Sequence, residues 1–120
     1  MFRVQVYRGD NLAAGARLAL RNRLYVSGWS LSGHYVDMMN DQEDGEIAIG
    51  FLDGEPICAV VSDLGQVMAF CRKALRRRGY TSACLAKLNT DGQVCETGVT
   101  GSEAFWRKNG IKFRWTWMNK

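Results

Sequence analysis

Hydrophobic and polar residues follow two different periods in the first third of the chain. They alternate over residues 3–7, which predicts a strand that ends at the turn residues Gly9-Asp10-Asn11. Over residues 12–25, leucines and alanines recur at helical spacing with arginines between them, which predicts an amphipathic helix. Residues 27–45 show no clear period and are rich in Gly, Ser, Asn and Asp. We interpret them as a partly helical loop that flanks a pocket.

The middle of the chain predicts three consecutive antiparallel strands. Residues 46–52 and 56–62 are β-rich runs around Asp53-Gly54, a dipeptide typical of two-residue hairpin turns. A second turn at residues 63–66 leads to the apolar run 67–72, which predicts the third strand.

The same apolar run also fits helical spacing. Its members at that spacing are Val67, Phe70, Cys71, Ala74 and Leu75. In this alternative a helix spans residues 66–78, and residues 81–99 form a hairpin around Thr90-Asp91-Gly92.

With the strand interpretation, helices and strands alternate to the end of the chain. We predict a helix at 82–88, a strand at 93–99, a helix at 101–108 with Gly110 as its C-cap, and a strand at 111–118. Phe113, Trp115 and Trp117 share one face of that last strand. The predicted fold class is α/β (α+β), in a single domain of residues 1–120.

Three arginines, a glycine and a helix start follow the run 67–72. A turn with converging N–H groups before a helix whose first amides are unpaired is suited to bind phosphate. Gly79 allows close approach of the backbone, Thr81 or Ser82 is expected to cap the helix, and Arg76-Arg77-Arg78 supplies positive charge.

Two motifs resemble the Gcn5-related N-acetyltransferase superfamily. Residues Arg76-Arg77-Arg78-Gly79-Tyr80-Thr81 resemble its pyrophosphate signature Arg/Gln-x-x-Gly-x-Gly/Ala, with Thr81 where Gly or Ala is usual. Residues 102–111 resemble its Ala-x-x-Phe-Tyr-x-Lys-x-Gly-Phe helix end. The two motifs cover about the C-terminal half of the chain and favour the strand interpretation. The resemblance implies a mixed, mostly antiparallel central sheet flanked by helices, with a splay between the fourth and fifth strands.

The resemblance also implies acetyl-CoA as cofactor. Its pyrophosphate would lie against the amides of Arg77, Gly79 and Thr81, and its pantetheine arm would pair with the backbone of Phe70 and Cys71. The Cys71 N–H would polarise the thioester carbonyl. The cofactor-binding residues implied in this way are Phe70, Cys71, Arg76, Arg77, Arg78, Gly79, Tyr80, Thr81 and Ser82.

The implied reaction is direct attack of a primary amine on the thioester. The family often uses a tyrosine as acid where this chain has Trp106, and an indole cannot serve as an acid. Candidate bases are Glu96, Asp63, and His34 or Asp37 in the loop that would border the acceptor site. An acidic run would attract a cationic amine, although a solvated loop explains it as well. The run consists of Asp41, Glu43, Asp44 and Glu46.

Composition narrows the remaining possibilities. The net charge of +4 and the pI of about 9.0 favour an anionic partner. The four cysteines lack CxxC spacing and there is one histidine, so we expect reduced core thiols in a cytoplasmic protein and no metal site. No membrane segment is expected. Two alternatives stay open: an acetyltransferase-like protein without catalysis that acts by binding another macromolecule, and a small basic nucleic-acid-binding module, which fits less well.

Overall fold

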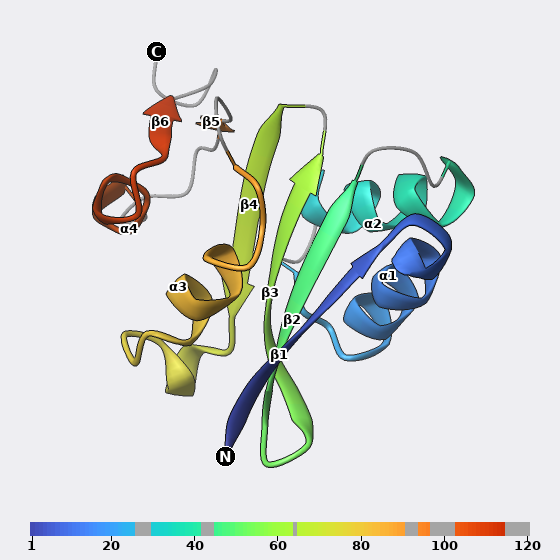
Figure 1. Cartoon of the computed structure of the whole chain (residues 1–120), viewed down its shortest axis with the longest axis horizontal. Coiled ribbons are helices and arrows are strands. Elements are labelled where there is room, and N and C mark those ends of the chain that lie inside the picture. Colours follow the sequence, from blue (N-terminus) through green and yellow to red (C-terminus); the bar gives the residue numbers. More distant parts are fainter. Residues whose placement is uncertain (26–29, 42–44, 64, 91–93, 97–102, 115–120) are drawn as a thin grey trace.

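The computed structural model describes residues 1–25, 30–41, 45–63, 65–90, 94–96 and 103–114 (Figure 1). Six strands and four helices lie in these ranges, with short 3₁₀ turns at Gly9–Asn11 and Lys73–Leu75. In chain order the elements are β1 (Phe2–Arg8), α1 (Leu12–Arg21), α2 (Ser30–Asp41), β2 (Glu46–Leu52), β3 (Glu55–Asp63), β4 (Gln66–Cys71), α3 (Tyr80–Leu85), β5 (Val94–Glu96), α4 (Glu103–Lys108) and β6 (Lys112–Arg114).

The strands form one sheet in the order β1-β2-β3-β4-β5-β6. The first four strands are antiparallel, whereas β4–β5 and β5–β6 are parallel pairs. The predicted mixed, mostly antiparallel sheet is therefore confirmed. Leu52 pairs with Glu55 across a two-residue turn in which both Asp53 and Gly54 have positive φ, as an Asp-Gly hairpin requires. The alternative helix over residues 66–78 is wrong, because β4 occupies Gln66–Cys71.

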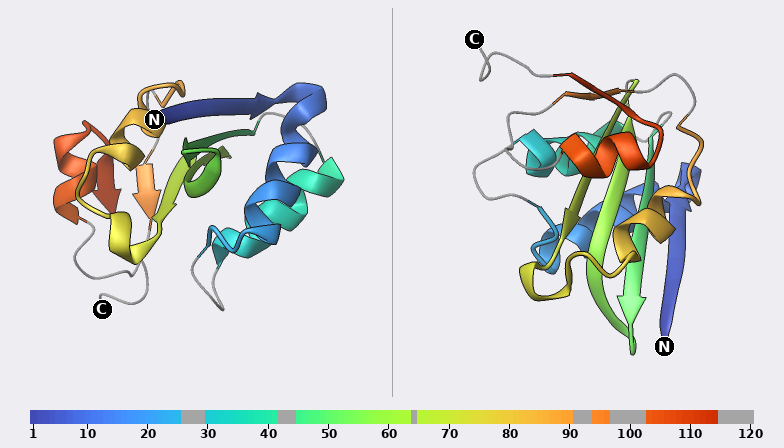
Figure 2. Two further views of the ribbon diagram at one scale, coloured as in Figure 1. Left: turned by 90° about the horizontal axis from the view of Figure 1, so that it is seen from below. Right: turned by 90° about the vertical axis from the view of Figure 1, so that its left-hand side faces the viewer.

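Helices cover both faces of the sheet (Figure 2). Alternate residues of β3 show the division, since Ala59 and Val61 face one core while Cys58 and Val60 face the other. The core on the α1 and α2 side contains Leu12, Ala16, Ala19, Leu24, Tyr35, Met38, Ile47, Ile49, Phe51, Ala59, Val61 and Met68. The core on the α3 and α4 side contains Ala48, Ile57, Cys58, Val60, Val67, Cys71, Cys84, Leu85, Leu88, Cys95, Trp106 and Ile111.

Several predicted boundaries need correction. The first helix ends at Arg21 and not at residue 25, because Arg23 takes a left-handed conformation that returns Leu24 to the core. The segment 27–45, which the sequence predicts to be a partly helical loop, contains the twelve-residue helix α2. Helix α3 spans Tyr80–Leu85 and not 82–88, since Gly79 is its N-cap.

The prediction that Gly110 caps the helix before it is confirmed by its φ of 76° and by the Ile111 N–H donating to the Trp106 carbonyl at 2.9 Å. The other residues of the predicted strand 93–99, apart from β5, lie outside the described ranges, as do Trp115 and Trp117. Within the described ranges, no helix has the length and apolar character needed to cross a membrane.

Candidate functional site

The loop between β4 and α3 contains two residues in the left-handed region shortly before a helix begins. After the 3₁₀ turn Lys73–Leu75, the residues Arg76, Arg77 and Arg78 are exposed. Arg77 has a φ of 66° and Gly79 one of 83°, so both lie in the left-handed region. Gly79 is the N-cap of α3 and no side chain caps the helix. The first amides of α3 are therefore left for a ligand or solvent.

Neither Thr81 nor Ser82 is the cap that the sequence predicts. Both residues lie inside α3, because the helix begins at Tyr80. The Thr81 side chain hydrogen-bonds the Cys71 thiol instead. A capping side chain must precede the helix, so the position of Gly79 excludes this role for either residue.

Two arginines near this loop have structural partners. Arg76 Nε donates to the Cys71 carbonyl at 2.9 Å, and its guanidinium carbon lies 5.9 Å from the centre of the Phe70 ring. Arg72 Nη2 donates to the Pro56 and Asn22 carbonyls, each at 3.3 Å. These contacts join the end of β4 to the loop that follows it, to β3 and to the end of α1.

Tyr80 lies at the start of α3 with its ring against β1. The Tyr80 and Phe2 ring centroids are 4.5 Å apart with an interplanar angle of 27°, which is a stacked pair. The side chain of Tyr80 is therefore part of the packing between α3 and β1, and only its backbone belongs to the turn.

The hydrogen-bond alternation of β4 decides which backbone groups face away from β3. The Arg72 N–H donates to the Ile57 carbonyl at 3.0 Å, and Cys71 is the partner of Cys58 in the ladder. In an antiparallel ladder the residues alternate, so the N–H and C=O of Phe70 face β3. Those of Ala69 and Cys71 face the β5 side. The groups that an added strand would meet are thus on Ala69 and Cys71, and not on Phe70 as the sequence suggested.

The described pairing between β4 and β5 is at Gln66 and Val94, the first residue of each strand. Ala69 and Cys71 lie further along β4, toward the loop that follows it.

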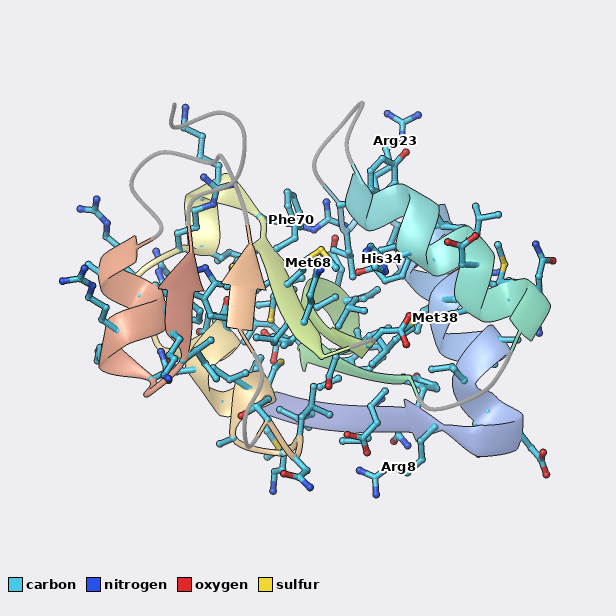
Figure 3. The ribbon with its side chains drawn as sticks, turned by 90° about the horizontal axis from the view of Figure 1, so that it is seen from above. Arg8, Arg23, His34, Met38, Met68 and Phe70 are labelled. Carbon is cyan, nitrogen blue, oxygen red and sulfur yellow. The ribbon has the colours of Figure 1, made fainter. Side chains whose placement is uncertain are left out.

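Two of the candidate bases, His34 and Asp63, lie next to each other, whereas Asp37 is exposed on α2. His34 Nδ1 is 3.8 Å from Asp63 Oδ2, although the residues come from α2 and from the end of β3. Their side chains are 18% and 15% exposed. Nδ1 of His34 is buried and has no hydrogen-bond partner among the described residues. Figure 3 labels His34 on α2, and Met68 and Phe70 of β4 belong to the core on the same side of the sheet.

The remaining polar candidates are less informative. The side chain of Glu96 lies outside the described residues, and its backbone pairs with Arg114 of β6. In the acidic run, Glu46 forms an ion pair with Arg8 Nε at 2.9 Å, and Glu43 and Asp44 lie outside the described ranges.

Trp106 belongs to the core on the α3 and α4 side. It is 3% exposed, and its ring meets that of Phe105 edge-on at a centroid distance of 4.9 Å. Trp106 therefore contributes packing to α4.

All four cysteines are buried and free. Cys58 Sγ and Cys84 Sγ are 3.6 Å apart. A hydrogen bond to Cys58, together with burial, raises the pKa of the Cys71 thiol above its ordinary range. The hydrogen bond to Cys71 favours the Cys58 thiolate, but the Cys84 contact and burial outweigh it and raise the pKa of Cys58 to about 12. The thiols of Cys58 and Cys71, whose pKa values are raised, are therefore protonated near neutral pH.

An open depression of about 440 Å³ lies between α4 and β6. It is bordered by Arg107, Gly110, Ile111 and Lys112. None of the residues that the sequence assigns to the site borders it, so the β4–α3 loop and the His34–Asp63 pair remain the better candidates for chemistry.

Several solved structures with a similar fold carry the names of N-acetyltransferases. The chain aligns with an aminoglycoside N-acetyltransferase in complex with CoA over 93% of its own length and 90% of the other chain, with 12% identity and a TM-score of 0.57. It covers 79% of a ribosomal-protein-alanine N-acetyltransferase from Brucella melitensis biovar Abortus 2308, with 97% of its own length aligned, 12% identity and a TM-score of 0.50. It covers 39% of a GCN5-related N-acetyltransferase-like protein from Streptococcus suis 89/1591, with 95% of its own length aligned, 18% identity and a TM-score of 0.50. No protein-family model and no curated protein sequence matches the chain.

Proposed function

We propose that this chain, which has the fold of the GCN5-related N-acetyltransferases, binds acetyl-CoA and transfers the acetyl group to a primary amine by direct attack. The observation that carries the proposal is the turn from β4 into α3. In it Gly79 is left-handed, the helix has no side-chain cap, and three exposed arginines precede it. That arrangement suits a pyrophosphate.

The diphosphate would be held by the backbone amides of Arg77, Gly79 and Thr81. A Cβ built on Gly79 would meet nothing within 4 Å, so the space beside the Cα of this residue is open. Arg77 and Arg78 offset the phosphate charge, whereas Arg76 is engaged with the Cys71 carbonyl. Tyr80 and Ser82 lie in the first turn of α3 and would contribute their backbone next to this loop.

The pantetheine arm would add to the sheet along β4. Its amide groups would pair with the outward-facing groups of Ala69 and Cys71, and the Cys71 N–H would polarise the thioester carbonyl. Acetyl-CoA supplies an activated acyl group, so the protein's contribution is orientation and a fixed dipole at the carbonyl.

The names of the similar structures support the acceptor class that we propose. The similar structures include an aminoglycoside N-acetyltransferase and a ribosomal-protein-alanine N-acetyltransferase, which both carry N-acetyltransferase names. We therefore propose an amine as the acceptor here.

Isothermal titration with acetyl-CoA tests the cofactor, and Gly79→Val tests the turn. We expect wild-type binding and at least a tenfold weaker affinity in the variant, because a β-branched side chain strains the left-handed backbone and blocks close approach. Gly54→Val is the matched control. Gly54 has a φ of 86° and, like Gly79, open space at its Cβ, but it lies in the β2–β3 hairpin.

Both variants should lose stability by about 1–2 kcal/mol, and only Gly79→Val should lose acetyl-CoA affinity. Absence of heat with millimolar acetyl-CoA would overturn the proposal. Binding without acetylated product across a panel of amines and peptides would favour the protein without catalysis.

A further inference from the structure

His34 has a polar atom whose environment calls for an explanation. Its Nδ1 is buried without a hydrogen-bond partner, which costs free energy in a folded protein unless the atom has another role. Asp63 Oδ2, at 3.8 Å, lies beyond hydrogen-bond range but close enough for an ion pair. A shift of less than 1 Å would bring Nδ1–H and the carboxylate into contact.

The tautomer with its proton on Nδ1 gives that nitrogen the carboxylate as partner. It leaves Nε2 with a free lone pair. In this tautomer the imidazole is oriented by Asp63 through Nδ1 and can accept a proton at Nε2.

The pair lies on the side of the sheet opposite α3. His34 is on α2, and Met68 and Phe70, whose side chains pack on the α1 and α2 side, flank Ala69 in β4 (Figure 3). Helix α3 packs on the other core through Cys84 and Leu85. Asp63 is opposite Gln66 at the start of β4, so His34 lies on the α2 side of this strand. A role for His34 requires that the amine approach the thioester from this side.

Other charged groups around α2 are less suited to the role. Asp37, on the same helix, is exposed. Arg72, at the end of β4, is bound to the Pro56 and Asn22 carbonyls. Tyr35 is fully buried and donates its hydroxyl hydrogen to the Leu24 carbonyl at 3.0 Å.

We propose that His34 takes the proton released by the acceptor amine and that Asp63 is the positioning residue for its imidazole. This proposal rests on the proposed acetyl transfer. The amine nitrogen forms a bond to the acetyl carbon and the carbon–sulfur bond breaks, with its electron pair leaving on the CoA thiolate. The amine proton passes to Nε2 of His34 and from there to the thiolate, which gives the amide and free CoA.

The chain has one histidine, so a single imidazole signal can be followed by nitrogen NMR. In the wild type we expect the tautomer protonated at Nδ1. Asp63→Asn should shift the population toward the tautomer protonated at Nε2, because the carboxylate that accepts from Nδ1 is gone. Asp37→Asn is the matched control. Like Asp63→Asn it removes one carboxylate charge, but Asp37 is exposed on α2, so this variant should leave the tautomer unchanged.

If the wild-type imidazole is protonated mainly at Nε2, the proposed orientation of His34 by Asp63 is overturned. This result does not depend on whether Asp63→Asn folds. An Asp63→Asn spectrum equal to the wild type would do the same.

Two ligands then test the placement. Acetyl-CoA should move the His34 signals, whereas adenosine 3′,5′-bisphosphate, which lacks the pantetheine arm, should bind the turn and leave them in place. If calorimetry shows acetyl-CoA binding and the imidazole does not respond, the role of His34 is overturned and the proposed function stands. If acetyl-CoA does not bind, the proposed function fails, and with it the role of His34, whatever the tautomer.

Discussion

Gly15 and Gly33 are both in helices, and their surroundings differ. A Cβ on Gly15 of α1 would lie 2.6 Å from Cβ and Cγ of Tyr7, which belongs to β1. A Cβ on Gly33 of α2 would meet nothing within 4 Å. Gly15 therefore allows α1 to approach the sheet closely, whereas Gly33 lies on an exposed helix surface.

Opposite effects on stability follow for the two alanine variants. Gly15→Ala should lower the free energy of unfolding by about 1–2 kcal/mol, because overpacking against Tyr7 exceeds the gain in helix propensity. Gly33→Ala should raise it by about 0.5–1 kcal/mol, since only the propensity changes. Urea denaturation measures both, and a stabilising effect of Gly15→Ala would contradict the close contact.

Helix α1 ends where the chain turns back so that Leu24 enters the core. The Arg23 N–H donates to the Leu20 carbonyl at 3.1 Å and the Leu24 N–H to the Ala19 carbonyl at 2.9 Å. With the φ of 56° at Arg23, this is a Schellman motif. Leu24 is fully buried as a result. Helical periodicity continues through Leu24 in the sequence, which is why a longer helix is predicted from the pattern.

Arg23→Gly should therefore stabilise the protein. Glycine removes the left-handed penalty of about 1–2 kcal/mol, and the greater freedom of the unfolded chain offsets part of it. We expect a net gain of about 0.5–1 kcal/mol in the free energy of unfolding. Arg21→Gly, two residues earlier in the last turn of α1, should instead lose about 1 kcal/mol. Thermal and urea unfolding of Arg23→Gly and Arg21→Gly measure the sign of each change in the free energy of unfolding. If both variants are less stable than the wild type, the strain at Arg23 is ruled out.

Considered as a whole, the molecule has a thiol-rich core on only one face of its sheet. Cys58, Cys71, Cys84 and Cys95 all belong to the core on the α3 and α4 side. The pKa values of Cys58 and Cys71 are raised in the folded state. Unfolding would restore the ordinary thiol value of 9.0.

Stability should consequently fall at alkaline pH. A raised pKa in the folded state gives a contribution that is complete below the unfolded pKa and is lost as pH rises toward the folded pKa, so the decline should begin above about pH 9. Each thiol adds up to about 1.4 kcal/mol per pH unit to the slope. Urea unfolding from pH 7 to 10.5 should show this decline, and Cys58→Ala should reduce it. An unchanged slope in that variant would argue against the raised pKa of Cys58.

Local patterns in the chain were sufficient to predict most of the sheet and the position of the turn. A period of two and an Asp-Gly dipeptide specify a hairpin through nearest neighbours, and Gly79 after three arginines marks a left-handed residue before a helix. Each of these signals acts over a few residues, so no distant part of the chain is needed to read them.

The approach of His34 to Asp63, the stacking of Tyr80 on Phe2 and the outward-facing backbone of Ala69 could not be read in the same way. The first two contacts depend on how α2 and α3 pack on the sheet, and the third depends on the register between β3 and β4. Packing and register are set by contacts between residues far apart in the chain, and a one-residue slip in the ladder would turn every β4 backbone group to the opposite side.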